Sequence, residues 1–173
     1  MPKVMNESFS HTTSHATAWP DMVQSAAGAL TGMDGAGGWP VQERLSAFFF
    51  MLLDALEGAG VHASTFNREA SACASDFHVA LREQLVDVLD AVDVPGVNRL
   101  VTDSAPSRFA VAEILVQLLS TSLADASDNR ERSAALADKS LAWAAALIAN
   151  PIPARTLDVV RYAMEAGYLR WKP

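Results

Sequence analysis

The chain has 173 residues, half of them hydrophobic and 19% charged, and a formal net charge of −7. This composition is typical of a packed globular domain, and the charge argues against a nucleic-acid partner because phosphate binding needs clustered Lys and Arg. The single cysteine, Cys73, excludes an internal disulfide and favours a reducing compartment, so we expect a cytoplasmic protein. The longest apolar runs, 47–53 and 141–149, are shorter than the roughly 20 residues that span a bilayer, so no membrane partner is expected.

The N-terminal segment 1–18 is rich in Ser, Thr and His and has no apolar period, which predicts a disordered tail. We expect the remainder, 19–173, to form a single helical domain. Its first helix is predicted over Trp19–Leu30, with Pro20 in the first turn and Gly32 ending it.

A central helix is predicted over Pro40–Leu56, where one apolar face carries Leu45, Phe48, Phe49, Leu52 and Leu56. Phe50 and its neighbours fill the other faces, so we expect this helix to be surrounded by protein. Gly58 and Gly60 predict its end. A weaker helix follows over Ser64–Cys73.

The next helix is amphipathic and is predicted to begin after Ser75 as its N-cap. Its inner stripe is expected to be Phe77, Leu81, Leu85, Val88 and Val92. Three further helices are predicted over Pro106–Ala124, Arg130–Ala149 and Pro153–Leu169. No alternating β pattern of useful length occurs, so the predicted fold is all-α, a bundle of about seven helices.

This order of helices resembles the C-terminal regulatory domain of the tetracycline-repressor (TetR) family. The similarity is carried by three segments: Glu43-Arg44-Leu45 in the first long helix, Phe109 to Leu123 where that family has a dimerisation helix, and Asp128 to Ile148 after it. The resemblance implies a homodimer that encloses a small hydrophobic ligand. A TetR protein begins with a three-helix DNA-binding unit, and at most 18 residues precede the first core helix here, so we expect a regulatory domain without its own DNA-binding head.

Large apolar side chains are the candidate ligand contacts, because such domains line a cavity with aromatic and methionine groups. The predicted ligand-binding residues are Trp19, Met22, Phe49, Phe50, Phe66, Phe77 and Trp143. Each of them individually is also compatible with an ordinary core position.

The helices Pro106–Ala124 and Arg130–Ala149 are apolar on more faces than one core can cover, which predicts a four-helix dimer interface. Its expected residues are Leu115, Leu118, Leu119, Leu141, Ala144, Ala145 and Ile148. The alternative is that the predicted terminal helix covers this surface within one chain.

No catalytic motif, metal-ligand motif or phosphate-binding loop is present, so neither an enzyme nor a cofactor is expected. His11 and His15 have the spacing of metal ligands but lack a third partner, and a polar tail is the favoured interpretation. His62 and His78 are interpreted as surface or helix-end residues, and Cys73 as a buried or half-buried structural cysteine. Two alternatives remain for the function: a lipid-handling accessory protein, similar to ubiquinone-biosynthesis helpers, and a purely structural dimerisation protein.

Overall fold

The computed structural model describes residues 19–94, 98–99, 103–127 and 130–149, and this part of the chain is built from helices. The elements are α1 (Trp19–Thr31), the 3-10 turn η1 (Ala36–Gly38), α2 (Val41–Gly58), α3 (Ala63–Glu69), α4 (Asp76–Leu89), α6 (Ala105–Ala124) and α7 (Glu131–Ala149). The expectation of an all-α fold is confirmed. The predicted tail 1–18 and the predicted terminal helix 153–169 lie outside the described residues.

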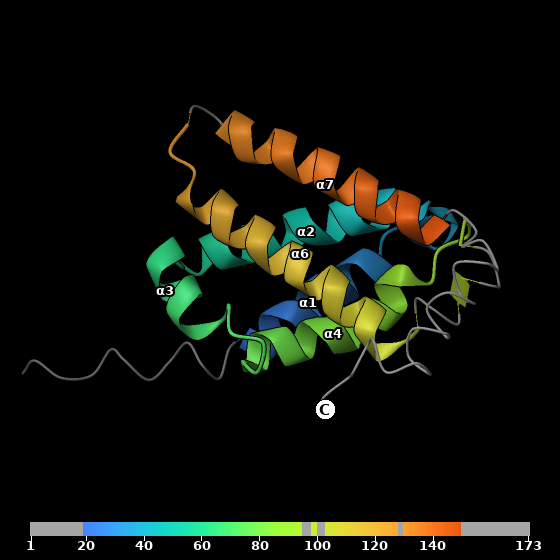
Figure 1. Cartoon of the computed structure of the whole chain (residues 1–173), viewed down its shortest axis with the longest axis horizontal. Helices are drawn as coiled ribbons and strands as arrows, with labels where there is room; N and C mark the ends of the chain where they lie inside the picture. The colour runs from blue at the N-terminus through green and yellow to red at the C-terminus, as the bar shows by residue number, and fades with distance from the viewer. Residues whose placement is uncertain (1–18, 95–97, 100–102, 128–129, 150–173) are drawn as a thin grey trace, which may run out of the picture.

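The central helix is α2, which contacts α1, α4, α6 and α7. Helices α6 and α7 run antiparallel beside each other, and α1 and α4 pack together on the other side of the molecule (Figure 1). This position explains why α2 carries apolar side chains on several faces. The helix is not fully surrounded by protein as expected, since Phe50 is 46% exposed.

The helix ends follow local signals in most places. The Ser75 hydroxyl accepts a hydrogen bond from the His78 backbone N–H at 3.2 Å, so the predicted N-cap of α4 is present. Gly60, with φ of 70°, lets the chain turn away after α2. The prediction fails at the end of α4, which stops at Leu89; Val92 is therefore not on its inner stripe and is 63% exposed.

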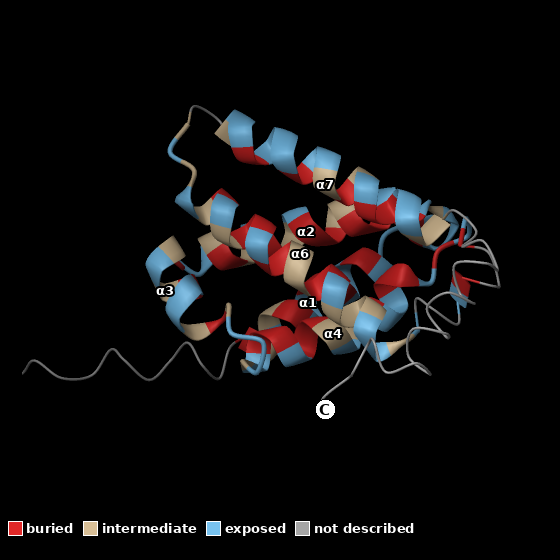
Figure 2. Cartoon of the chain, in the orientation of Figure 1, coloured by how far each residue is buried: buried red, intermediate tan, exposed pale blue. Residues whose placement is uncertain are grey.

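One continuous core joins the described helices, and α3 contributes Phe66 to it. Figure 2 shows the buried residues directed toward the interior and the exposed ones along the outer side of α7. The largest fully buried side chains are Trp19, Phe48, Phe49, Phe66, Phe77, Leu30, Leu45, Leu52, Leu56, Leu81, Leu85 and Leu115.

A buried guanidinium connects the beginning of α2 with the end of α4. Arg44 is 6% exposed and donates hydrogen bonds to the carbonyl oxygens of Val88 at 3.0 Å, Ala36 at 3.1 Å and Asp87. The last carbonyl groups of a helix lack partners within the helix and carry partial negative charge, so a cation is favourable there. Arg44 thus caps α4 from a neighbouring helix.

Among the described residues, α6 is the one single helix long and apolar enough to cross a membrane by length and composition. Its apolar side chains are used inside the molecule, since Val111, Leu115 and Leu119 are buried where α6 packs against α4 and α7. The buried residues make up 39% of the most apolar window of α6.

Candidate functional site

Three of the predicted ligand-binding residues meet in one aromatic cluster. Trp19 begins α1, Phe66 lies on α3 and Phe77 is in the first turn of α4, and all three are at most 1% exposed. Their rings pack edge to face, with centroid distances of 6.2 Å for Trp19–Phe66, 5.9 Å for Trp19–Phe77 and 5.3 Å for Phe66–Phe77. Edge-to-face contact at these distances is the packing of a filled core.

The other predicted ligand residues do not join this cluster. Met22 is half-buried against the core, and Phe49 is fully buried with its ring 5.1 Å from that of Phe50. Phe50 is 46% exposed, because it lies about 100° around α2 from Phe49 and thus outside the buried stripe. Trp143 is 59% exposed on α7. The seven residues therefore do not line one common cavity.

The residues predicted for the dimer interface are mostly inside the protomer. Leu115, Leu118, Leu119, Leu141, Ala144 and Ala145 are at most 5% exposed, and Ile148 is half-buried against the core. They are buried because α6 and α7 pack on each other and on α2. A surface made of these side chains is not available to a second chain without opening the core.

A different set of apolar side chains on α7 is exposed. Leu136, Trp143 and Leu147 are 46%, 59% and 55% exposed. With Ser140 they follow a spacing of four, three and four residues, which places them along one side of the helix. We call these four residues the α7 stripe. Beside it lies a hollow of about 270 Å³, lined by Ile114 of α6 and by Lys139, Ser140 and Trp143.

A cluster of polar side chains joins the α3–α4 loop, α4 and α6. Nε2 of His78 lies 3.3 Å from Oε2 of Glu113, and the Cys73 thiol donates to the same oxygen at a sulfur–oxygen distance of 3.8 Å. His78 is fully buried, whereas Cys73 is exposed. Thiol, imidazole and carboxylate atoms of the three residues all lie within 4.8 Å of one another. These side chains could hold a metal ion.

The carboxylate of Glu113 is kept charged by its neighbours. Gln117, one turn further along α6, donates from Nε2 to Oε1 of Glu113 at 3.1 Å, and this bond is the main cause of a lowered pKa at Glu113. His78 and Cys73 act on the pKa in the same direction, and partial burial opposes them. Gln117 occupies one carboxylate oxygen and leaves the other to His78 and Cys73.

Little in the sequence indicates this cluster. Cys73, His78 and Glu113 are separated by up to 40 residues in the sequence. His78 does lie at a helix end, but it is fully buried and not at the surface, and the prediction of a buried or half-buried Cys73 is wrong because its side chain is exposed. The one available signal was the position of His78 directly after Phe77, since a polar residue next to a core aromatic at a helix start is brought toward the neighbouring helix.

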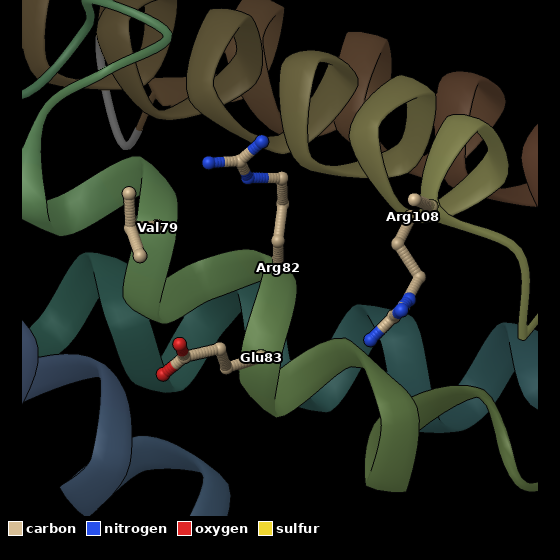
Figure 3. Close-up of a pocket in the computed structure, with 5 residues that line it drawn as sticks. Val79, Arg82, Glu83 and Arg108 are labelled. Carbon is tan, nitrogen blue, oxygen red and sulfur yellow. The ribbon is translucent and has the colours of Figure 1, made fainter.

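A second hollow lies between α4 and the beginning of α6 and has a volume of about 220 Å³. It is lined by Val79, Arg82, Glu83, Ala105 and Arg108. Arg82 donates to the His78 carbonyl at 3.3 Å and lies 5.9 Å from the centre of the Phe109 ring. Figure 3 shows the guanidinium groups of Arg82 and Arg108 pointing in different directions, so they do not converge on one anion.

Comparison with protein-family models, with curated proteins and with solved structures found no match to this chain. The TetR resemblance therefore stays a prediction.

Proposed function

We propose that this chain is a homodimeric helical module that pairs through the α7 stripe. The observation that carries the proposal is the alignment of Leu136, Trp143 and Leu147, each about half exposed, on one side of one helix. Large aligned apolar groups are costly in water, and soluble proteins use such patches as interfaces.

A second copy is the occupant that this surface fits best. The part of α7 that carries Trp143 and Leu147, residues 141–149, contains no charged residue, so two such parts pair without burying an unpaired charge. Nearer to Leu136, the exposed Asp138 and Lys139 have opposite charges. The spacing of four and three residues is that of helices packed side by side. A two-fold axis that passes beside the α7 stripe, between the two copies of the helix, would bury the same patch twice, and Trp143 has the size and polarity of a central interface anchor.

The proposed biological setting is the one implied by the TetR resemblance: a cytoplasmic, regulator-like dimer without a DNA-binding head. The net charge of −7 supports the expectation that this chain does not bind DNA directly. Pairing through α7 equally suits the two alternatives, a lipid-handling accessory protein and a purely structural dimerisation protein.

A matched pair of variants tests the dimer. Trp143→Glu should raise the dimer Kd by about 30-fold or more, because a charge replaces a central apolar anchor worth about 2 kcal/mol. Val86→Glu is the control, since Val86 is 43% exposed on α4. Sedimentation over a concentration series measures both, and circular dichroism verifies that the fold is kept. Monomeric wild-type protein at micromolar concentration would end the proposal.

Small hydrophobic ligands are a second candidate function, favoured by the hollow beside Trp143. Its volume of about 270 Å³ is close to the lower end of ligand pockets, and Ile114 and Trp143 give it an apolar lining. Titration with a hydrophobic fluorescent dye should saturate, and Trp143→Ala should weaken the binding. Saturable binding that is unchanged in this variant would contradict the assignment.

A further inference from the structure

The cluster of Cys73, His78 and Glu113 combines three different metal-ligand chemistries at one point of the molecule. The residues come from the α3–α4 loop, the first turn of α4 and the middle of α6. The N-cap bond from His78 N–H to Ser75 fixes the loop against the helix start, which holds Cys73 close to His78. The fold thus brings the donors together, although they are distant in sequence.

The donor spacing can be compared with the edges of a tetrahedral zinc site. Zinc bonds of about 2.0–2.3 Å imply separations of about 3.4 Å between nitrogen and oxygen and about 3.6 Å between sulfur and oxygen. The observed separations from Glu113 Oε2 are 3.3 Å to His78 Nε2 and 3.8 Å to Cys73 Sγ. Sulfur and nitrogen lie within 4.8 Å and have to approach, and the exposed Cys73 is the side that can move.

The buried imidazole has few polar partners. His78 is fully buried, and its Nδ1 has no hydrogen-bond partner among the described residues. Its ring packs 5.4 Å from the ring of Phe109, which leaves the edge carrying Nε2 directed at Glu113. A zinc ion at Nε2 would not satisfy Nδ1, so the support that His78 gives to a metal site is the position of its Nε2 beside the Glu113 carboxylate.

We propose that Cys73, His78 and Glu113 bind one zinc ion. The ion would take the thiolate sulfur, the imidazole Nε2 and the carboxylate Oε2, and leave the fourth position on the exposed side of Cys73 for water. Sulfur and nitrogen donors with one carboxylate favour zinc over calcium or magnesium, which prefer oxygen ligands alone. Cys73 releases its thiol proton to solvent on binding, and His78 binds as the neutral imidazole.

A hydrogen bond from Gln117 orients the Glu113 carboxylate for this site. Gln117 holds the second carboxylate oxygen, so Glu113 would bind through one oxygen only. Partners of this kind orient metal ligands, and their loss typically lowers affinity about 10- to 100-fold. Gln117→Ala should therefore weaken zinc binding by about that factor without removing a ligand.

Zinc titration of the full chain against a chromophoric chelator tests the site. The wild type should bind one zinc per chain, and Cys73→Ala should lower the affinity by more than about 100-fold, the upper end of the effect of an outer partner. Because Cys73 is exposed, this variant keeps the fold. Glu113→Gln is the second ligand variant. His62→Ala and Glu83→Gln alter exposed residues of the same types and should bind like the wild type.

Cobalt gives an independent readout, because a bound thiolate produces an intense charge-transfer absorption. This absorption should appear with the wild type and be absent with Cys73→Ala. The double variant His11→Ala/His15→Ala must keep both signals, since these histidines could bind metal by themselves. The proposal would be overturned by a wild-type chain that does not bind one zinc ion, or by a Cys73→Ala chain that binds zinc as tightly as the wild type. Both outcomes are independent of whether the protein is a monomer or a dimer.

Discussion

Replacing Phe77 with alanine distinguishes a filled aromatic core from a ligand-lined cavity. Phe77 is fully buried and makes two edge-to-face contacts, with Trp19 and Phe66. Removal of a core phenylalanine costs about 3–5 kcal/mol of unfolding free energy from lost burial and the cavity left behind. The two ring contacts place Phe77 at the upper end, about 4–5 kcal/mol. Domains of this kind have about 5–15 kcal/mol in total, so Phe77→Ala should lie close to unfolding.

Urea unfolding followed by far-UV circular dichroism measures this loss, provided that the slope of the transition is unchanged. Phe50→Ala is the control, because the same atoms are removed from a side chain that is 46% exposed, and we expect a loss of about 1 kcal/mol. If Phe77→Ala fails to fold, Phe77→Leu gives a milder change at the same position. A loss below about 2 kcal/mol for Phe77→Ala, similar to that of the control, would refute a filled core and strengthen ligand binding there.

Two further predictions concern helix ends. Arg44→Met should lower the unfolding free energy by about 2–4 kcal/mol, because buried carbonyl groups lose a charged donor. Urea unfolding measures this loss. The control is Arg132→Met at an exposed position, which should change the unfolding free energy by less than about 0.5 kcal/mol. Hydrogen bonds from Ser127, then Ser133, hold the pKa of Asp125 well below its ordinary value, so its stabilisation is present at neutral pH and is lost as pH falls below about 4. Asp125→Asn should therefore be less stable than wild type at pH 7, with a gap in urea midpoint that narrows at about pH 3; an equal gap at both pH values would contradict this.

The helices could be predicted from the sequence because their signals are local. Apolar spacing, the Ser75 N-cap and Gly60 act within a few residues, and α2, α4 and α6 begin where these signals indicate. The error at Val92 has a local cause too, since its apolar side chain continues the period of α4 although the helix has already ended. An apolar residue in phase with a helix does not by itself prove that the helix continues.

Which apolar side chains remain exposed could not be predicted in this way. Leu141 and Trp143 lie two residues apart on α7, and the first is buried while the second is exposed. The difference depends on how α7 is rotated against α2 and α6, which is set by packing and not by periodicity. The same holds for Cys73, His78 and Glu113, whose contact depends on how α4 and α6 pack.

The contacts of Arg44 have a consequence for how substitutions are tolerated along the chain. Its three partners, in Ala36, Asp87 and Val88, contribute carbonyl oxygens, which every amino acid has. These hydrogen bonds therefore do not depend on which side chain stands at the three partner positions. The guanidinium itself cannot be replaced, even by lysine, because a single ammonium group lacks the planar fork of donors. In a library of single substitutions, intolerance should concentrate at Arg44, and the exposed Asp87 should accept nearly any residue that suits a helix.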